Sequence, residues 1–130
     1  MKYMLDTNTV SYFLTGHGSV RSALLSKPTT SICVSVITEA ELYYGLARRP
    51  DAMRLQLGVA EFLRRVDVVP WTSAIAVKYG TLRVTLEQAG KTLAPLDLQI
   101  AAHALAVDAV LVTSEKAFAN VPDLKIESWV

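Results

Sequence analysis

The chain has 130 residues, of which 52% are apolar and 19% charged, with a formal net charge of +1 and a mean hydropathy of +0.32. This length predicts a single domain over residues 1–130. No apolar run approaches the roughly 18 residues of a membrane span, and the N-terminus has no signal-peptide core. The single cysteine, Cys33, excludes an internal disulfide and is typical of the reducing cytoplasm, where we expect the protein to act. Because the net charge is only +1, any nucleic acid would have to bind a local basic patch and not the surface as a whole.

Short β-branched or aromatic segments alternate with helical ones along the sequence. In chain order, the expected elements are a strand at 2–5, helices at 8–14 and 19–25, a strand at 31–35, helices at 36–49 and 51–65, a strand at 66–70, helices at 72–90 and 96–107, a strand at 109–113 and a weaker strand at 124–129. Strands that are apolar on both faces and alternate with helices indicate a mainly parallel sheet within an α/β sandwich.

Five residues are expected to set helix boundaries. Pro50 ends one helix, and Asp51 is a candidate N-cap for the next. Thr72 or Ser73 is a candidate cap for the long helix, with Gly90 as its C-terminal glycine. Pro95 is expected to open the helix that follows, since proline favours the first helical position.

Acidic side chains follow several of these elements at the edge where a parallel sheet binds ligands. Asp6 ends the first strand, and Glu39 and Glu41 lie on the helix after the second. Asp97 lies in the first turn of a helix, and Glu115 comes two residues after the fourth strand. This placement predicts a cluster of carboxylates at one edge of the sheet.

Each acid also has a purely structural explanation. Asp6 is a suitable turn or cap residue, Glu115 can simply begin a short helix, and the helix dipole favours Asp97. However, Asp97 shares a helical face with apolar residues, where an unpaired carboxylate is unfavourable. Helical phase does not decide between Glu39 and Glu41, because they flank opposite sides of a wide apolar arc.

Taken together, the acids indicate a metal site. Converging carboxylates raise one another's pKa values unless a cation compensates their charge. Oxygen ligands suit Mg²⁺ or Mn²⁺, which can activate water and neutralise the charge that develops on a phosphodiester. Zinc is not favoured, because Cys33, His17 and His103 have no ligand spacing.

Four segments resemble a known family in their order and spacing: "MLDTNTVSYFL", "SVITEAELYYG", "LAPLDLQIAAHAL" and "VLVTSEKAFANVPDLKIESW". They are similar to PIN-domain proteins, and more closely to the VapC toxins of bacterial toxin–antitoxin pairs. The resemblance covers essentially the whole chain. It implies a three-layer α/β/α sandwich around a central, mainly parallel sheet of four to five strands.

The resemblance assigns Asp6, Glu41 and Asp97 as metal ligands and catalytic residues. It selects Glu41 over Glu39 because the family glutamate stands four residues before a glycine, here Gly45. Glu115 occupies the position of a fourth catalytic acid.

This fourth position departs from the family pattern, which commonly has Thr-Asn followed by aspartate or asparagine. Here Thr113, Ser114 and Glu115 stand in that place. Glu115 is therefore expected to bind a second metal ion, to act through a water molecule, or to lie outside the ligand set. Asn8, Thr113 and Ser114 are expected to support the carboxylates.

The resemblance further implies a Mg²⁺- or Mn²⁺-dependent endoribonuclease that cleaves transfer or ribosomal RNA and inhibits translation. It implies a homodimer, and a hetero-oligomer with a neutralising VapB-type antitoxin. Arg83, Lys91 and Lys116 are the candidate RNA contacts, because they lie near or lead into the acidic segments.

Three alternatives remain open. "LDTNTV" partly matches the haloacid dehalogenase phosphatase pattern, although Asn8 replaces its second aspartate. A metal-free ribonuclease would need His17 or His103 as a general base. The altered fourth position favours a non-catalytic PIN-like module that binds RNA or protein.

Overall fold

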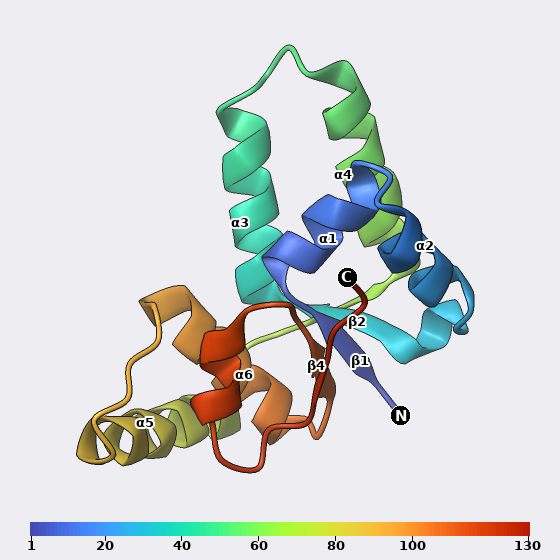
Figure 1. Cartoon of the computed structure of the whole chain (residues 1–130). Helices are drawn as coiled ribbons and strands as arrows, with labels where there is room; N and C mark the ends of the chain where they lie inside the picture. Colours follow the sequence, from blue (N-terminus) through green and yellow to red (C-terminus); the bar gives the residue numbers. More distant parts are fainter.

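The computed structural model describes residues 1–130 and contains a five-stranded sheet whose neighbouring strands are all parallel (Figure 1). The strand order is β3-β2-β1-β4-β5. The five strands are β1 (Tyr3–Leu5), β2 (Ile32–Ser35), β3 (Asp67–Val69), β4 (Val110–Val112) and β5 (Ile126–Glu127). Each lies inside a predicted strand segment, so the mainly parallel sheet predicted from the sequence is confirmed.

The helices also occur where the sequence predicts them, with small changes at their ends. They are α1 (Thr7–Leu14), α2 (Gly18–Leu25), α3 (Val36–Ala47), α4 (Met53–Arg65), α5 (Ser73–Gln88) and α6 (Pro95–Ala106), with two short 3₁₀ turns, η1 (Thr29–Ser31) and η2 (Lys116–Asn120). Helices α3 and α4 form an arm that extends away from the sheet (Figure 1). No helix is both long enough and apolar enough to cross a membrane.

Two boundary predictions were wrong, around Pro50. Helix α3 ends at Ala47 because proline disfavours helical geometry in the preceding residue, and the Arg49 amide instead bonds the Leu46 carbonyl. Asp51 does not cap α4. The N-cap is Ala52, and the amides of Ala52 and Met53 are satisfied by backbone carbonyls of the turn.

At α5 and α6 the predictions were closer. Thr72 precedes α5 as its N-cap, although its side chain forms no capping bond. Gly90 has a φ of +69°, and the Lys91 amide bonds the Leu86 carbonyl in a glycine-terminated helix end. Pro95 is the first residue of α6, as predicted.

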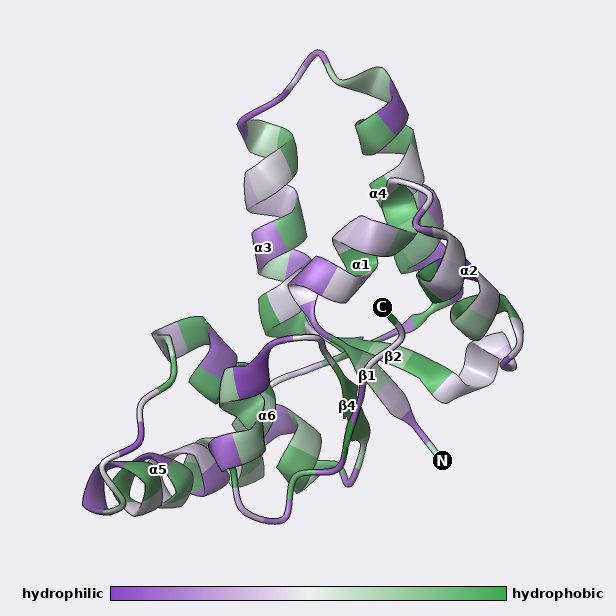
Figure 2. Cartoon of the chain, in the orientation of Figure 1, coloured by the Kyte–Doolittle hydropathy of each residue, from purple (hydrophilic) through white to green (hydrophobic).

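The two faces of the sheet carry separate hydrophobic cores. Successive strand residues point to opposite faces, so Met4 belongs to one core and Leu5 to the other. The first core packs against α5, α6 and η2, and the second against α1, α2 and α4. Figure 2 shows β4 hydrophobic throughout, as expected for a strand covered on both faces. This arrangement is the predicted three-layer α/β/α sandwich.

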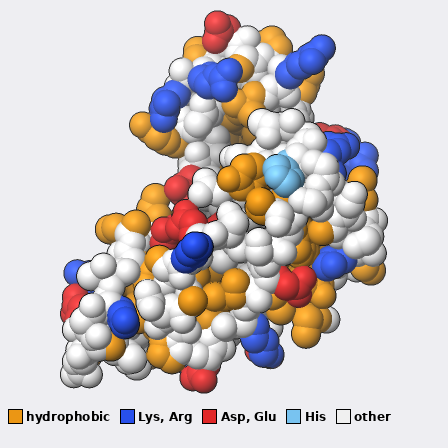
Figure 3. All heavy atoms as spheres, viewed as in Figure 1, with side chains coloured by type: hydrophobic (Ala, Val, Ile, Leu, Met, Phe, Trp, Pro, Cys, Tyr) orange, Lys and Arg blue, Asp and Glu red, His pale blue; other side chains and the backbone are white.

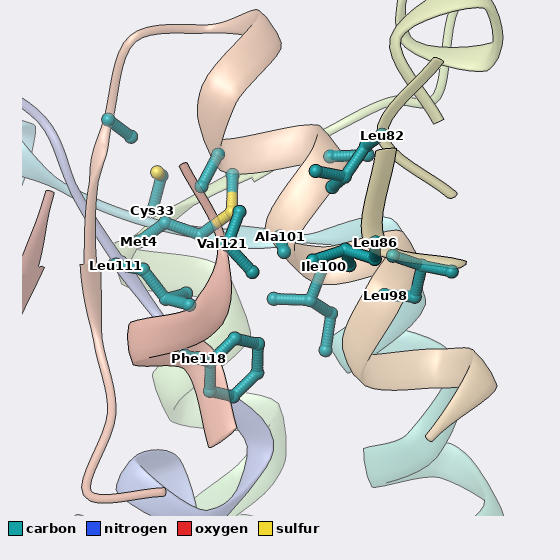
Figure 4. Packing of buried hydrophobic residues seen from close by; sticks show 13 residues of the cluster. Met4, Cys33, Leu82, Leu86, Leu98, Ile100, Ala101, Leu111, Phe118 and Val121 are labelled. Carbon is teal, nitrogen blue, oxygen red and sulfur yellow. The ribbon is translucent and has the colours of Figure 1, made fainter. Parts of the chain in front are cut away.

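Phe118 anchors the segment that follows Glu115. It is fully buried in the first core, where Figure 4 shows it in one cluster with Met4, Ile100 and Leu111. Since η2 begins at Lys116, burial of Phe118 fixes the chain immediately after the fourth candidate acid.

We expect Phe118→Ala to lower the free energy of unfolding by about 3–5 kcal/mol, because it removes a large buried side chain and leaves a cavity. Denaturant unfolding followed by circular dichroism measures this change. The control is Val77→Ala, at a side chain that is 71% exposed, with an expected effect within about 0.5 kcal/mol. Equal effects of the two substitutions would contradict the packing described here.

Candidate active site

A small cavity of about 90 Å³ lies at the carboxyl edge of the sheet, and no apolar side chain lines it. Its lining residues come from the starts of α1 and α6, from α3 and from the segment after β4: Asp6, Thr7, Asn8, Glu41, Asp97 and Glu115. In Figure 3, acidic side chains gather in the middle of the face viewed, below the arm formed by α3 and α4. The structure thus brings together the four predicted acids.

Asp6 both caps a helix and lines this cavity. Its side chain is only 3% exposed, and Oδ1 accepts a 2.8 Å bond from the Thr9 amide at the start of α1. Its own amide donates to the Val112 carbonyl of β4, which fixes the residue to the sheet. The two explanations offered by the sequence are therefore compatible, because capping engages one carboxylate oxygen.

Glu41, rather than Glu39, is the α3 glutamate that lines the cavity. Thr7 Oγ1 donates a 2.6 Å hydrogen bond to Glu41 Oε1, which orients the carboxylate. No pattern in the sequence predicted this contact of Thr7. A hydroxyl residue between Asp6 and Asn8 was visible in the sequence. Its hydrogen-bond partner, however, lies 34 residues away along the chain, so no local pattern links the two.

Burial of the site and the charges of the other acids strongly perturb Asp97. Burial, a hydrogen bond with Glu115, and the charges of Glu115, Asp6 and Glu41 raise its pKa to about 7 from an ordinary 3.8. The N-terminus of α6 provides the opposing, favourable dipole.

Glu115 is held from both sides. Asn8 Nδ2 donates a 3.0 Å bond to Glu115 Oε1, and the Glu115 amide donates a 3.1 Å bond to Thr113 Oγ1. Asn8 and Thr113 therefore each hydrogen-bond to this residue. Ser114 is exposed and is absent from the cavity lining, and no side-chain bond from it to the carboxylates is present.

The donor set matches a hard divalent cation in its chemistry. Carboxylate oxygens are the ligands that Mg²⁺ and Mn²⁺ prefer, and a cation would relieve the repulsion that raises the pKa of Asp97. As they stand, no three acidic, histidine or cysteine side chains already have a metal-holding geometry. Rotamer changes would therefore be needed to gather the carboxylate oxygens around an ion. The long, flexible side chains of Glu41 and Glu115 permit such changes.

The three basic candidates lie outside this cavity. Arg83 and Lys91 line a neighbouring cleft of about 230 Å³ between α5 and the start of α6. Leu98, which follows Asp97 directly, lines the same cleft. Arg83 is held by the Tyr79 hydroxyl at 3.2 Å and by Glu87 at 3.3 Å. Lys116 is exposed, next to Glu115.

Neither histidine is placed to act as a general base here, because His17 and His103 do not line the cavity. His103 is fully buried against Trp71 and Ser35. His17 packs on Tyr12 at the α1–α2 turn. The metal-free alternative therefore has no support at this site.

The family model described as "PIN domain" matches residues 3–124. The chain belongs to the PIN-domain family. Among its relatives are "Ribonuclease VapC2" of Rickettsia felis, 38% identical over 99% of this chain and 98% of the relative, and "tRNA(fMet)-specific endonuclease VapC" of Salmonella typhimurium, 33% identical over the same shares. This PIN-domain chain is thus of the VapC type, and the phosphatase alternative is wrong.

Solved structures agree with this assignment to the PIN domain. VapBC2 from Rickettsia felis, bound to a DNA fragment from its promoter, matches with a TM-score of 0.91 and 37% identity over 100% of both chains. DNA-bound VapBC from Salmonella typhimurium matches with a TM-score of 0.93 and 31% identity, over 100% of this chain and 99% of the other.

We expect Asp97→Asn to stabilise the metal-free protein more at pH 8 than at pH 5. Because the folded-state pKa lies above the ordinary value, stability falls as the pH rises from about 4 to about 7 and the carboxyl becomes charged in the folded chain. Asparagine removes this charge. Thermal unfolding with chelator at both pH values measures the effect, and the exposed Asp51→Asn is the control. An equal stabilisation at both pH values would contradict the raised pKa.

Proposed function

We propose that this protein is a divalent-metal-dependent endoribonuclease toxin that cleaves RNA and inhibits translation. The observation that carries the proposal is the convergence of Asp6, Glu41, Asp97 and Glu115 on one cavity. The ribonuclease and tRNA(fMet)-specific endonuclease names of the VapC relatives support RNA, and transfer RNA first, as the substrate.

In this proposal, Asp6, Glu41 and Asp97 hold the ion, with Mg²⁺ first and Mn²⁺ as the alternative. Glu115 is the fourth acidic residue of the cavity lining. A divalent cation in such a site supplies positive charge beside a phosphodiester and lowers the pKa of water. Because Asp97 keeps a proton up to about pH 7, ion binding would displace that proton, and acidic pH would weaken both binding and activity.

The surrounding polar groups orient the carboxylates. Thr7 fixes Glu41 through its hydroxyl, Asn8 fixes Glu115 through its amide, and Thr113 fixes the backbone of Glu115. These bonds hold the side chains before substrate arrives, which reduces the reorganisation needed during the reaction. Arg83, Lys91 and Lys116 would bind the RNA backbone beside the acidic cavity, whose own charge repels phosphate.

We further propose a VapB-type antitoxin as the neutralising partner, a homodimer, and a cytoplasmic site of action where translation takes place. The VapBC complexes among the structural relatives support the antitoxin. Tyr43 and Tyr44 on α3 are 54% and 64% exposed, and aromatic side chains of this kind are enriched in protein interfaces.

We expect Glu41→Gln and Asp97→Asn each to lower kcat/KM for RNA cleavage about 10²-fold or more, because each removes a ligand of the cation that would stabilise transition-state charge. Cleavage with mapped RNA ends measures this, and we expect 5′ phosphates and 3′ hydroxyls. Expression of Asp97→Asn should no longer arrest growth, and chelator should stop cleavage by the wild type.

The matched control is Glu39→Gln, which changes an acid on the same helix outside the cavity and should retain full activity. Wild type that binds RNA without cutting any RNA class would favour the non-catalytic module. A fully active, folded Asp97→Asn protein would overturn the assignment of Asp97.

If Arg83 and Lys91 contact RNA, Arg83→Ala and Lys91→Ala should each reduce the salt dependence of RNA binding. The slope of the logarithm of the binding constant against the logarithm of the salt concentration should become shallower by roughly 0.7–0.9, the value for one lost phosphate contact. RNA binding would be titrated at several salt concentrations, in the Asp97→Asn background so that RNA stays intact. Lys78→Ala is the control, since Lys78 is exposed on the same helix but does not line the cleft. An equal slope for Arg83→Ala and Lys78→Ala would remove Arg83 from the proposed contacts.

A further inference from the structure

His103 is a fully buried titratable residue that the proposed reaction does not use. It lies on α6, and its Nδ1 is 2.7 Å from Ser35 Oγ at the end of β2. Its ring also packs edge-on against Trp71, with centroids 5.6 Å apart and planes at 76°. A buried polar pair of this kind sets the relative position of the elements that carry it.

Ser35 Oγ takes part in two hydrogen bonds. Ser35 caps α3, because its Oγ accepts a 3.0 Å bond from the Ile37 amide. The hydroxyl also shares a hydrogen bond with His103 Nδ1, whose direction follows the imidazole tautomer, while the buried Nε2 has no hydrogen-bond partner. Burial lowers the pKa of His103, which favours the neutral ring.

This single bond joins the two helices that carry acids into the cavity. Ser35 immediately precedes α3, which carries Glu41, and His103 lies on α6, which carries Asp97. The other two acids have a different support. Asp6 directly follows β1, and Glu115 lies between β4 and η2, so the sheet itself fixes both.

We propose that Ser35 and His103 act as positioning residues that set the separation of Glu41 and Asp97 across the acidic cavity. The proposal rests on the proposed function for its effect on rate. A misplacement of about 1 Å in a catalytic group can reduce rate by roughly 10²-fold. Loss of the pair should therefore act on kcat, while RNA binding, which depends on other surfaces, stays nearly constant.

The kinetic test compares Ser35→Ala, His103→Leu, the double variant and His103→Asn. We expect the first two to lower kcat about 10- to 100-fold with KM within roughly threefold. The double variant should be no slower than Ser35→Ala, because that substitution already removes the bond to His103 together with the cap on Ile37. His103→Asn should recover much of the rate, since its side-chain amide can form a hydrogen bond with Ser35 Oγ near the position of Nδ1, as acceptor or as donor.

A structural readout separates positioning from general destabilisation and needs no RNA. In the metal-free protein, the carboxyl ¹³C chemical shifts of Glu41 and Asp97 should move in Ser35→Ala and His103→Leu. They should stay unchanged in Val20→Ala, which removes buried volume from α2 in the other core. Val20→Ala should also keep its kcat at temperatures where it is folded.

Unmoved carboxyl shifts, additive kinetic losses, or an equal loss of kcat in Val20→Ala would each overturn the positioning role. If the wild type cuts no RNA but the carboxyl shifts of Glu41 and Asp97 still move in Ser35→Ala and His103→Leu, the proposed function alone is contradicted. The positioning of Glu41 and Asp97 by Ser35 and His103 would then stand on the shifts.

Discussion

Carboxyl groups that share a small cavity repel one another, and the fold must supply the free energy that keeps them together. In this chain, four of them face about 90 Å³ of space, and the pKa of Asp97 rises to about 7. No lysine or arginine forms an ion pair with any of the four. Hydroxyl, amide and helix N-terminal donors stabilise them instead, and a bound cation would complete the compensation.

The parallel sheet supplies the geometry for this arrangement. Because all strands run the same way, their carboxyl ends meet at one edge, and the register of β1 with β4 brings Asp6 close to the segment that carries Glu115. Hydrophobic cores on both faces keep that edge rigid. The acids on α3 and α6 depend in addition on how those two helices pack, which gives the buried Ser35–His103 bond its importance.

Local and functional roles coincide in several residues. Asp6 ends a strand, caps a helix and lines the cavity, so its local role does not argue against a catalytic one. Ser35 likewise ends β2, caps α3 and holds His103. Such overlap explains why each acid, considered alone in the sequence, had an adequate structural explanation. Their convergence in space, rather than any single residue, indicates a site.

The sequence by itself determined the order of strands and helices, the parallel sheet and the short list of acids. Those features depend on local patterns: apolar runs, Gly90 after a helix and Pro95 before one. Asp51 shows the limit of such patterns, since backbone carbonyls of the preceding turn satisfied the amides it was expected to cap.

Only the tertiary structure decided which groups meet. It gave Thr7 its role beside Glu41 and paired Asn8 with Glu115 across 107 residues. The physical reason is that helix and strand periodicity are fixed by near neighbours. Contacts between distant side chains depend instead on strand order, register and helix packing, which no local segment encodes.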